Sequence, residues 1–443
     1  MSNIKQELLQ KIESKELVVG VIGLGYVGLP LAVEKANAGY KVIGFDVLPE
    51  KVKMVNEGHN YIGDVVDEEL SELAKNGMLR ATDNFEEVAS CDFIAIAVPT
   101  PLDKYQQPDI SYVKKSTTDV SKYLKKGSIV VLESTTYPGT TEELMLPILE
   151  EGSGLKCGED FYLAFSPERV DPGNKIYKTK NTPKVIGGVG EDSTEVAAAL
   201  YRNVLEGEVF TVSSPKVAEM EKILENTYRN VNIGLVNEFA LIANKMGINI
   251  WEVVDAAKTK PYGFQAFYPG PGIGGHCIPL DPFYLTWKAK EYDAHMRIIE
   301  ASGSVNDFMP EWVIDRSLRI LSKKFKKSLN GAKVLILGIA YKNDIDDLRD
   351  SPALVVIEHF RNEGAELEYY DGYNPSYIDE NGEKIHSLKE LTPEIVSSYD
   401  LVVITTNHSN VDYQMVADNA KYVFDTKYAT KDVKDNNNNI ELL

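Results

Sequence analysis

One cysteine of the sequence stands among glycines. Residues 267–282 read FYPGPGIGGHCIPLDP, with Cys277 near the centre and glycine at positions 270, 272, 274 and 275. Glycine lets a backbone wrap closely around a ligand and present amide donors, while a thiol stays accessible. A free cysteine is more often a small buried hydrophobe, but this density of glycine and proline argues against a core helix or strand. We therefore interpret Cys277 as a nucleophile that bonds covalently to a substrate.

The other two cysteines carry no comparable signal. Cys91 stands at the head of an apolar run, and Cys157 lies in a polar segment. Three scattered cysteines are too few for a disulfide framework or a CxxC metal site. The sequence therefore indicates a reducing cytoplasm and predicts no metal centre.

A glycine motif near the N-terminus predicts a dinucleotide site. Gly23, Gly25 and Gly28 form a GxGxxG pattern between an apolar run and a helical segment over 29–38. Such glycines allow a tight turn and a close approach to pyrophosphate, whose charge sits at a helix N-terminus. Asp46 follows Gly28 by 18 residues, where a carboxylate binds the ribose 2′-hydroxyl and repels a 2′-phosphate. We expect NAD rather than NADP, with Lys51 either at the adenosine end or solvated.

A lysine and an asparagine share one face of a long helical pattern. Lys222 and Asn226 are four residues apart within 214–246, so a helix would direct an ammonium and an amide to the same point. The alternative for Lys222 is a solvated lysine paired with Glu219 or Glu225. A helix of about 30 residues would be roughly 45 Å long, which suggests that it joins two domains. We expect its apolar face to pack against a dimer partner, although the same face could equally serve a core within the chain.

Short apolar runs alternate with helical patterns in two parts of the chain, and this alternation is typical of βαβ units in parallel sheets. The runs are 17–22, 41–45, 93–98, 128–132, 161–165, 184–186 and 208–212, then 333–337, 367–370, 401–405 and 422–424. We predict an α/β protein with an N-terminal Rossmann-type NAD-binding domain over 1–212. A long central helix with a helical middle domain over 213–310 carries the cysteine loop. A second Rossmann-like α/β domain over 311–443 completes the chain.

Charge and hydropathy limit the partners. The net charge of −20 argues against nucleic acid and anionic membranes. No apolar run approaches about 18 residues, so no membrane span is expected. Residues 1–15 carry Ile4, Leu8 and Ile12 at helical spacing, which predicts a short amphipathic helix instead of a secretory signal.

Six ordered motifs give the sequence a wider resemblance. They are GLGYVGLPLA, VPTP at 98–101, ESTTYPGT at 133–140, FSPERVDPG at 165–173, the GPGIGGHCIPLDP loop, and LGIAYKNDIDDLRDSPA at 337–353. Together they resemble the UDP-glucose/GDP-mannose dehydrogenase superfamily along essentially the whole chain. The cysteine loop is most similar to that of bacterial UDP-N-acetylglucosamine 6-dehydrogenases. Leu280 stands where the UDP-glucose branch usually has lysine, and Asn343 where relatives commonly have proline.

The resemblance implies oxidation of a UDP-sugar C6 alcohol to a carboxylate. This change removes four electrons whereas each NAD accepts two, so the same site must act twice. Cys277 would add to the intermediate aldehyde and give a thiohemiacetal, whose oxidation leaves a thioester for hydrolysis.

The resemblance also implies roles for other residues. Lys222 and Asn226 would stabilise negative charge on the C6 oxygen, Asp281 would act with the lysine in proton transfer or water positioning, Glu168 would assist thioester hydrolysis, and Thr136 would hold a water. The implied NAD contacts are Gly23, Gly25, Tyr26, Val27, Gly28, Asp46, Lys51, Thr100, Thr136 and Arg349. The implied substrate contacts are Glu168, Arg169, Lys222, Asn226, Tyr268, Gly272, Gly274, Gly275, Tyr341 and Lys342.

Other functions remain open at this point. The substrate could be UDP-glucose, UDP-N-acetylmannosamine or the galacto epimer. A two-electron hydroxyacid dehydrogenase shares the three-part layout, and a sensor of NAD or UDP-sugar that lost its chemistry is a non-enzymatic alternative. The simultaneous presence of Cys277, Lys222, Asn226 and Asp281 argues against such a sensor.

Overall fold

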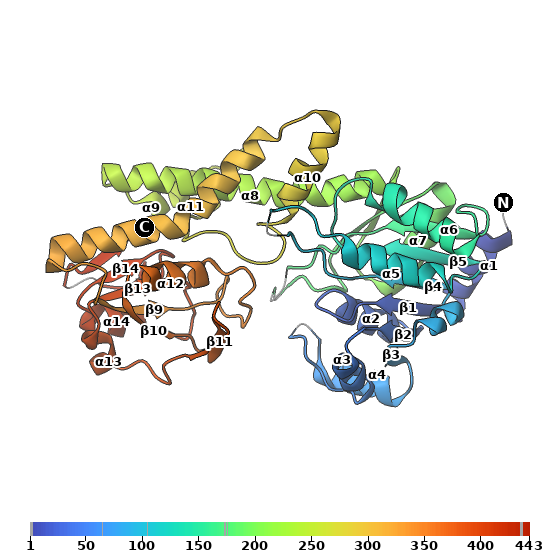
Figure 1. Ribbon diagram of the computed structural model, residues 1–443, viewed down its shortest axis with the longest axis horizontal. Helices are drawn as coiled ribbons and strands as arrows, with labels where there is room; N and C mark the ends of the chain where they lie inside the picture. The colour runs from blue at the N-terminus through green and yellow to red at the C-terminus, as the bar shows by residue number, and fades with distance from the viewer. Residues whose placement is uncertain (1–2, 64, 104, 172–173, 175, 435–436) are drawn as a thin grey trace. The chain divides into compact units, whose positions relative to one another are not determined.

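The computed structural model describes residues 3–63, 65–103, 105–171, 174, 176–434 and 437–443. The chain divides into two compact units (Figure 1). The first comprises Met1–Glu225 and Phe283–Ala294, and the second comprises Asn226–Pro282 and His295–Leu443. Each unit is built around its own β-sheet.

The sheet of the first unit has the strand order β3-β2-β1-β4-β5-β6-β7-β8. All neighbouring strands are parallel except β6 and β7. The strands are β1 (Val18–Ile22), β2 (Lys41–Phe45), β3 (Leu79–Thr82), β4 (Phe93–Ile96), β5 (Ser128–Leu132), β6 (Phe161–Phe165), β7 (Lys184–Gly188) and β8 (Val209–Val212). Because β1 lies between β2 and β4, the chain reverses direction across the sheet at β1, which is where parallel sheets bind nucleotides.

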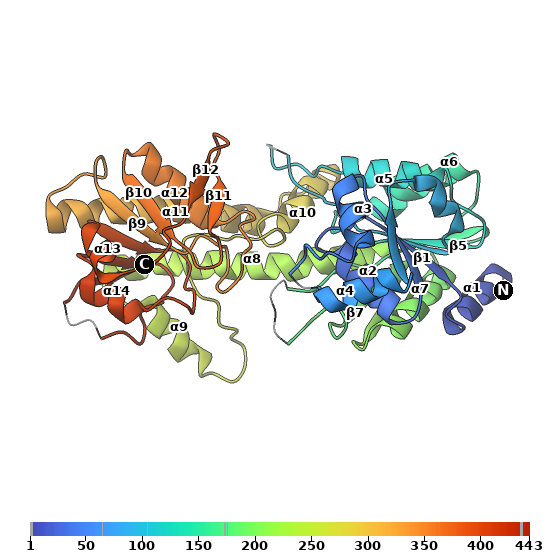
Figure 2. The same cartoon turned by 90° about the horizontal axis from the view of Figure 1, so that it is seen from below.

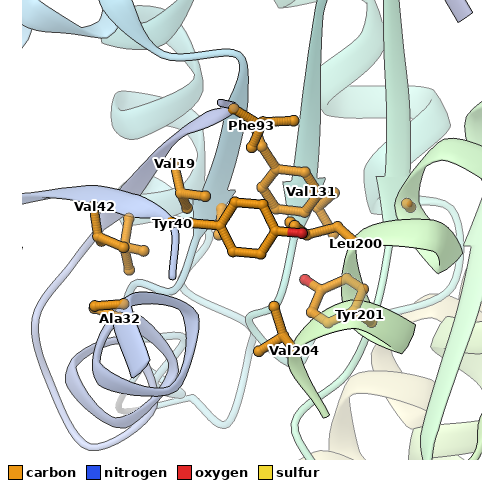
Figure 3. Packing of buried hydrophobic residues seen from close by; sticks show 14 of the residues in the cluster. Val19, Ala32, Tyr40, Val42, Phe93, Val131, Leu200, Tyr201 and Val204 are labelled. Carbon is orange, nitrogen blue, oxygen red and sulfur yellow. The ribbon is translucent and has the colours of Figure 1, made fainter. Parts of the chain in front are cut away.

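Both faces of this sheet are buried, as the continuous apolar strands require. Alternate strand residues enter two hydrophobic clusters: Val131 belongs to one and Val130 to the other. The first cluster packs Tyr40, Phe93 and Tyr201 together (Figure 3). The covering helices are α1 (Asn3–Glu13), α2 (Gly28–Asn37), α3 (Pro49–Asn56), α4 (Asp67–Lys75), α5 (Ser111–Ser121), α6 (Leu146–Ser153) and α7 (Glu191–Val204).

The amphipathic N-terminal helix is present as predicted. In α1 the side chains of Ile4, Leu8 and Ile12 are buried in the first cluster, and the helix packs against α7. A period near 3.6 residues brought the three apolar side chains to one face, so the prediction from spacing is confirmed.

The second unit contains an all-parallel sheet with the order β10-β9-β13-β14-β15. Its strands are β9 (Lys333–Leu337), β10 (Glu366–Tyr370), β13 (Leu401–Ile404), β14 (Val423–Asp425) and β15 (Ile440–Leu442), and β11 (Ser376–Ile378) and β12 (Lys384–His386) form a separate antiparallel pair. Helix α12 (Pro352–Asn362) packs on one face of this sheet, whereas α13 (Pro393–Ser398) and α14 (Tyr413–Asn419) pack on the other (Figure 2).

Long helices follow the first sheet. Helix α8 (Pro215–Met246) has 32 residues and contributes to both units. It is followed by α9 (Ile250–Lys258), α10 (Asp281–Ala289) and α11 (Arg297–Ile320). The predicted α/β class, with a parallel sheet at each end and a helical middle, is confirmed. Among the described residues, every helix is too short or too polar to cross a bilayer.

Candidate active site

The three motif glycines of the first unit have three different surroundings. Gly23 has φ +88°, and a Cβ there would lie 2.5 Å from the Ala97 carbonyl oxygen. A Cβ on Gly28 would lie 1.7 Å from the Gly23 oxygen, whereas one on Gly25 would meet nothing within 4 Å. Gly23 and Gly28 are therefore required for the turn and for close packing of helix and strand, and Gly25 leaves the backbone accessible. This arrangement fits a pyrophosphate at the N-terminus of α2.

Asp46 directly follows β2 and faces the glycine loop. Its Oδ2 accepts a hydrogen bond from Leu24 N at 2.9 Å, and its Oδ1 accepts one from Leu48 N at 3.0 Å. Lys51 Nζ lies 3.6 Å from Asp46 Oδ2. Two backbone donors leave acceptor sites on this carboxylate for a ribose hydroxyl, and Lys51 is held beside it. Tyr26 and Val27 complete the loop, with Tyr26 half exposed.

Thr100 and Thr136 lie in loops beyond the carboxyl ends of β4 and β5. The Thr100 carbonyl oxygen accepts a hydrogen bond from the Tyr284 hydroxyl. Thr136 Oγ1 lies 2.7 Å from Thr140 Oγ1, and Thr140 donates to the Tyr137 carbonyl oxygen at 2.8 Å. The buried Thr136 hydroxyl is thus held by a neighbouring hydroxyl and not by a charged group.

Glu168 follows β6 and is fixed by several donors. Its Oε1 accepts hydrogen bonds from Arg169 N and Val170 N, each at 2.9 Å, and its Oε2 accepts one from Lys184 Nζ at 3.3 Å. Arg169 Nε donates to Glu225 Oε2 at 3.3 Å and Nη1 donates to the Pro183 oxygen at 3.0 Å. Arg169 is therefore bound to the C-terminal end of the α8 segment that belongs to this unit.

Lys222 is buried on α8, with 6% of its surface exposed. Glu219 accepts hydrogen bonds from Gly139 N and from the backbone and hydroxyl of Thr141. Glu225 is bound by Arg169. Within the described part of the chain no hydrogen bond or ion pair within 4 Å joins Lys222 to Glu219 or Glu225. Burial would raise the pKa of Glu225, but Arg169, Glu221 and the charge of Lys222 lower it, so Lys222 does interact with this carboxylate electrostatically. A buried ammonium of this kind is suited to a negatively charged ligand oxygen.

In the second unit Cys277 is exposed at the end of the glycine loop. Leu280 N and Asp281 N donate to the Cys277 carbonyl oxygen at 3.2 and 2.9 Å. This turn leads directly into α10, of which Asp281 is the first residue. An accessible thiol on a turn agrees with the prediction from the glycine pattern. Among the described residues, Cys91 is buried and Cys157 half-buried, and burial raises the pKa of Cys91 to about 11 and that of Cys157 to about 12.

Asparagines on α8 hold this loop, and sequence reasoning missed most of them. Asn226 Nδ2 donates to Asp281 Oδ2 at 2.6 Å, and Asn230 Nδ2 donates to the Ile278 oxygen at 3.1 Å. Asn237 Oδ1 accepts from Gly270 N at 3.0 Å. All three side chains are buried. Polar residues recurring on the inner face of a helix were the available signal, because buried amides need partners.

A second layer of polar groups orients these asparagines. Ser302 and Asn306 of α11 donate to the side-chain oxygen and the backbone oxygen of Asn230, at 2.9 and 3.2 Å. Asn237 Nδ2 donates to Asn306 Oδ1 at 2.9 Å. The loop is therefore fixed at both ends by a connected network of hydrogen bonds.

The glycines before Cys277 allow a close approach of the 341–352 segment. A Cβ on Gly274 would lie 2.6 Å from Tyr341 Cβ, and one on Gly275 would lie 2.9 Å from the Tyr341 ring. Gly272 has φ +133°, and its Cβ would lie 2.9 Å from Pro352 Cβ. Gly275 N donates to the Arg349 carbonyl oxygen at 3.0 Å. The glycine density is thus explained by packing within the unit as well as by any contact with a ligand.

The other predicted residues of this unit lie around the same segment. The guanidinium of Arg349 donates to both oxygens of Asp347, with Nε at 3.0 Å from Oδ1 and Nη2 at 2.6 Å from Oδ2. Lys342, the neighbour of Tyr341, is half-buried. Tyr268 donates its hydroxyl to Asp255 Oδ1 at 2.7 Å. His276, beside Cys277, is half-buried, and burial together with Arg349 lowers the pKa of its imidazole.

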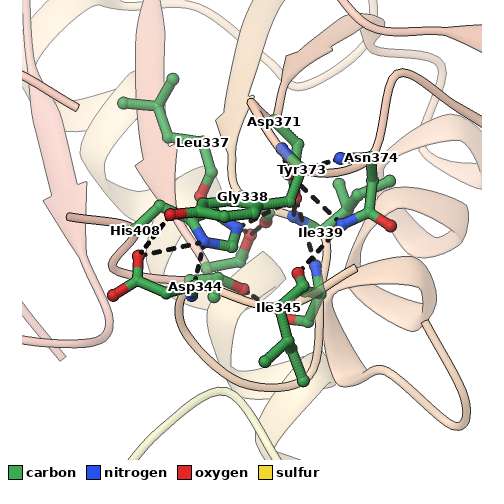
Figure 4. Close-up of polar contacts among 12 residues, drawn as sticks. Leu337, Gly338, Ile339, Asp344, Ile345, Asp371, Tyr373, Asn374 and His408 are labelled. Carbon is green, nitrogen blue, oxygen red and sulfur yellow. Dashed lines mark hydrogen bonds and ion pairs between the residues drawn. The ribbon is translucent and has the colours of Figure 1, made fainter. Parts of the chain in front are cut away.

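A buried histidine and aspartate anchor the loop that contains Tyr341 and Lys342 (Figure 4). Asp344 N donates to His408 Nδ1 at 3.0 Å, so the His408 proton is on Nε2, which lies 3.0 Å from Asp371 Oδ2. Asp371 Oδ2 also accepts from Ile339 N and Ala340 N, and Oδ1 from Tyr373 N and Asn374 N. Burial would raise the pKa of Asp371, but His408 and these amides outweigh it and hold the pKa below its usual value.

The predicted residues thus form two groups, one in each unit. The first unit holds the glycine motif with Asp46 and Lys51, the threonines, and Glu168 with Arg169 and Lys222. The second unit brings together Cys277, Asn226, Asp281, and the segment with Tyr341 and Arg349. A parallel sheet with a glycine turn after its first strand and a carboxylate after the next, in a chain that also exposes a thiol on a glycine-rich loop, is typical of a dinucleotide-dependent dehydrogenase.

Comparison with protein families places the chain within this class. Residues 17–205 match the NAD binding domain of the UDP-glucose/GDP-mannose dehydrogenase family, residues 216–308 its central domain, and residues 335–432 its UDP binding domain. The chain belongs to the UDP-glucose/GDP-mannose dehydrogenase family. It is an NAD-dependent nucleotide-sugar 6-dehydrogenase, as the sequence motifs predicted.

Individual relatives have two different substrates in their names. The chain is 36% identical over 420 residues to the UDP-N-acetyl-D-glucosamine 6-dehydrogenase of Pseudomonas aeruginosa, covering 95% of this chain and 97% of the relative. It is 36% identical over 391 residues to the UDP-N-acetyl-D-mannosamine dehydrogenase of Pyrococcus horikoshii, covering 88% and 89%. A solved structure of UDP-D-ManNAc dehydrogenase from Pyrococcus horikoshii matches with a TM-score of 0.86 and 34% identity, over 96% of this chain and 98% of that one.

Proposed function

We propose that this enzyme oxidises the C6 alcohol of UDP-N-acetylglucosamine to the uronic acid through a thioester on Cys277. The observation that carries the proposal is the exposed thiol on a turn fixed by buried asparagines, immediately before a buried aspartate. A nucleophile held by a network of hydrogen bonds is suited to addition to an aldehyde, because little reorganisation is needed.

The thiol solves a problem of electron counting. When bound, NAD accepts the hydride removed in each of two oxidations. Oxidation of the alcohol gives an aldehyde, which has no alkoxide from which a second hydride can leave until a nucleophile adds. Addition of the Cys277 thiolate gives a thiohemiacetal, and its oxidation gives a thioester. Water then adds to the carbonyl carbon, the carbon–sulfur bond breaks, and the acid is released with the thiolate restored.

The neighbouring side chains supply charge stabilisation and proton transfer. Lys222 and Asn226, one helical turn apart on α8, would stabilise the negative C6 oxygen. Asp281, which accepts the amide of Asn226, would act with Lys222 in proton transfer or in positioning water. Glu168 would accept the proton of the hydrolytic water, and Thr136 would hold a water through its hydroxyl.

Two sets of residues would bind the two nucleotide ligands. NAD would contact Gly23, Gly25, Tyr26, Val27, Gly28, Asp46, Lys51, Thr100, Thr136 and Arg349. The sugar nucleotide would contact Glu168, Arg169, Lys222, Asn226, Tyr268, Gly272, Gly274, Gly275, Tyr341 and Lys342. We keep the division into 1–212, 213–310 and 311–443 as the domains that carry these roles.

UDP-N-acetylmannosamine is the second candidate substrate, because similar relatives are named for it. UDP-glucose is less favoured, since Leu280 stands where that branch usually has lysine. Initial rates with the three UDP-sugars, measured with GDP-mannose as a control, test the choice. The highest kcat/KM is expected for UDP-N-acetylglucosamine, and a higher value for either rival would replace our assignment.

Counting NADH tests the four-electron reaction itself. With limiting UDP-sugar and excess NAD, about two NADH should form for each sugar consumed. A ratio of one NADH for each sugar would show that the enzyme carries out only a two-electron alcohol oxidation, for which no thioester is needed.

We further propose a homodimer formed through α8 and a cytoplasmic location. Eight large apolar side chains of α8 are exposed: Val217, Met220, Leu224, Tyr228, Leu235, Phe239, Ile242 and Met246. Their spacing of three, four or seven residues places them along one face of the helix. An exposed apolar face of this length is typical of an interface between chains. The free thiols agree with a reducing compartment.

A further inference from the structure

Four charged groups form a buried row inside the first unit. Lys35 Nζ lies 3.2 Å from Glu133 Oε1, Lys184 Nζ lies 2.8 Å from Glu133 Oε2, and Lys184 Nζ lies 3.3 Å from Glu168 Oε2. The Lys35, Glu133 and Lys184 side chains are at most 5% exposed, whereas the Glu168 side chain is 15% exposed. The row therefore starts in the core and ends at a partly exposed carboxylate that belongs to the predicted site.

The surroundings of the row are apolar and aromatic. Tyr201 donates its hydroxyl to Glu133 Oε1, and the Lys35 and Lys184 ammonium groups lie 5.3 and 5.2 Å from the centre of its ring. Phe93 packs against the same ring (Figure 3). In such a medium an unbalanced charge is costly. Two ammonium groups face one enclosed carboxylate, and Glu168 supplies the second negative charge that makes the row neutral.

The pKa directions agree with this pairing. Burial would raise the pKa of Glu133, but Lys184 and Lys35 lower it to about 2. Burial would lower the pKa of Lys184, but Glu133 and Glu168 outweigh it and raise the pKa. For Lys35, burial prevails and lowers the pKa. Of the two lysines, Lys184 is therefore the one whose positive charge is stabilised, and its ammonium lies between Glu133 and Glu168.

Each proton of the Lys184 ammonium has an acceptor. The acceptors are Glu133 Oε2, Glu168 Oε2 and, at 3.4 Å, the Pro167 carbonyl oxygen. Lys184 is the first residue of β7 and Glu133 immediately follows β5, where its backbone N–H donates to the Ile96 oxygen. The backbone of β7 and the Glu133 carboxylate after β5 therefore determine the position of the Lys184 ammonium. The ammonium in turn determines the orientation of the Glu168 carboxylate.

The acceptor capacity of Glu168 is almost filled. A carboxylate has about four acceptor sites; Arg169 N and Val170 N occupy those of Oε1, and Lys184 occupies one of Oε2. The site that remains is on Oε2, beside the ammonium. A water that donates a proton to Glu168 must therefore approach this oxygen.

We propose that Lys184 is a positioning residue that aligns Glu168 Oε2 with the water that hydrolyses the thioester. The inference rests on the proposed function. In this step the water oxygen bonds to the thioester carbonyl carbon, the carbon–sulfur bond breaks, Cys277 leaves as thiolate, and the water proton goes to Glu168 Oε2. No electrons are transferred, and Lys184 keeps all its protons. Its loss would slow hydrolysis without changing either oxidation.

The chain offers a matched control. Lys184→Met and Lys35→Met each remove one buried ammonium from Glu133, and each leaves the other lysine as its partner. Lys184 contacts Glu168, whereas Lys35 does not bond to it. A purely structural role predicts similar consequences for the two variants, and a positioning role predicts an effect specific to Lys184. Lys184→Gln provides a second neutral variant if the methionine variant does not fold, and Lys184→Arg keeps the charge.

The experiment follows one turnover with excess enzyme, UDP-N-acetylglucosamine and NAD. Stopped-flow absorbance measures NADH, and mass spectrometry of acid-quenched samples measures the adduct on Cys277. For Lys184→Met and Lys184→Gln we expect the release of two NADH at rates near wild type, accumulation of the adduct, and a kcat lowered about 10- to 100-fold with little change in KM for NAD. Lys35→Met should accumulate no more adduct than wild type, and Lys184→Arg should recover part of kcat.

A double variant completes the test. If both residues act on the same step, Lys184→Met combined with Glu168→Gln should be no slower than Glu168→Gln alone. Multiplicative losses, or an adduct in Glu168→Gln but not in the Lys184 variants, would overturn the role of Lys184 and leave the thioester mechanism intact. Formation of only one NADH per sugar by the wild type, with no adduct in Glu168→Gln, would instead refute the proposed function.

Discussion

Asn226 Nδ2 lies 2.6 Å from Asp281 Oδ2, and both side chains are buried. This hydrogen bond joins α8 to the first residue after the cysteine turn. The orientation of Asp281 is therefore set from the helix that also carries Lys222.

Replacing Asn226 should affect both stability and catalysis. Asn226→Leu removes a donor from a buried carboxylate, which should lower the free energy of unfolding by about 1–3 kcal/mol and kcat by roughly 10- to 100-fold. Urea denaturation and NADH formation measure the two effects. Asn232→Leu is the control, because Asn232 donates to the Tyr228 oxygen within the same helix. Equal losses in the two variants would contradict a special role for the bond to Asp281.

Cys277→Ser tests the covalent step separately from binding. The hydroxyl is a far weaker nucleophile than a thiolate at neutral pH, so turnover to the acid should fall by about a thousandfold or more. Calorimetry should give a dissociation constant for the UDP-sugar within a few-fold of wild type, because the rest of the loop is unchanged. Near-normal acid production would exclude Cys277 as the nucleophile. Cys157→Ser, at a half-buried position of the first unit, is the control.

Glu221 should make stability depend on pH. Burial, followed by the nearby Glu225 carboxylate, raises the pKa of Glu221 to about 7. Between the unfolded pKa near 4.5 and about 7, the folded protein binds more protons than the unfolded one, so the free energy of unfolding decreases as pH rises through this window. Glu221→Gln removes the dependence, and its stability relative to wild type should increase from pH 4.5 to pH 8.

Thermal unfolding across this pH range measures the effect. Glu238→Gln is the control, since it removes the same charge from an exposed position of α8. A parallel pH dependence in both variants would mean that overall charge, and not the burial of Glu221, is responsible.

A charge on the apolar face of α8 should disrupt the proposed dimer. Phe239 is 54% exposed within the chain, and Phe239→Glu would place a carboxylate in the interface, where its desolvation is unfavourable. Sedimentation should show a dimer for wild type and a shift towards monomer for the variant. Ile378→Glu, at an apolar position that is 63% exposed on β11, should not change the association state. A wild-type monomer would exclude the proposed interface.

Strands were predictable where local sequence determines them. The apolar runs gave β1, β4 and β9 within two residues of the observed ends, because both faces of these parallel strands are buried. Strand β3 alternates between buried and exposed residues and contains Arg80, so it produces no apolar run. Strand β15, which pairs with β14, has only three residues. Three residues are too few to show a reliable hydrophobic pattern.

Site residues were predictable where a motif specifies the backbone. Gly23 and Gly28 occupy conformations or contacts that exclude a Cβ, and the GxGxxG pattern records that requirement. The partners of side chains were not predictable in the same way. Lys184 and Glu133 are 51 residues apart, and although Glu133 begins the ESTTYPGT motif, nothing in that motif indicates Lys184 as its partner. Their pairing arises from the order of strands in the sheet, which the local sequence does not specify.

The two sheets have the same strand arrangement around their first strands, β1 and β9. The aspartates that follow the neighbouring strands have different hydrogen-bond partners. Asp46 follows β2 and Asp371 follows β10, the equivalent strand of the second unit. Asp46 receives two backbone amides, whereas Asp371 receives four and also the imidazole of His408. Its acceptor capacity is exhausted. Asp371 therefore has no acceptor site left to bind the hydroxyls of a ribose. A nucleotide that binds at this sheet must be recognised by other groups.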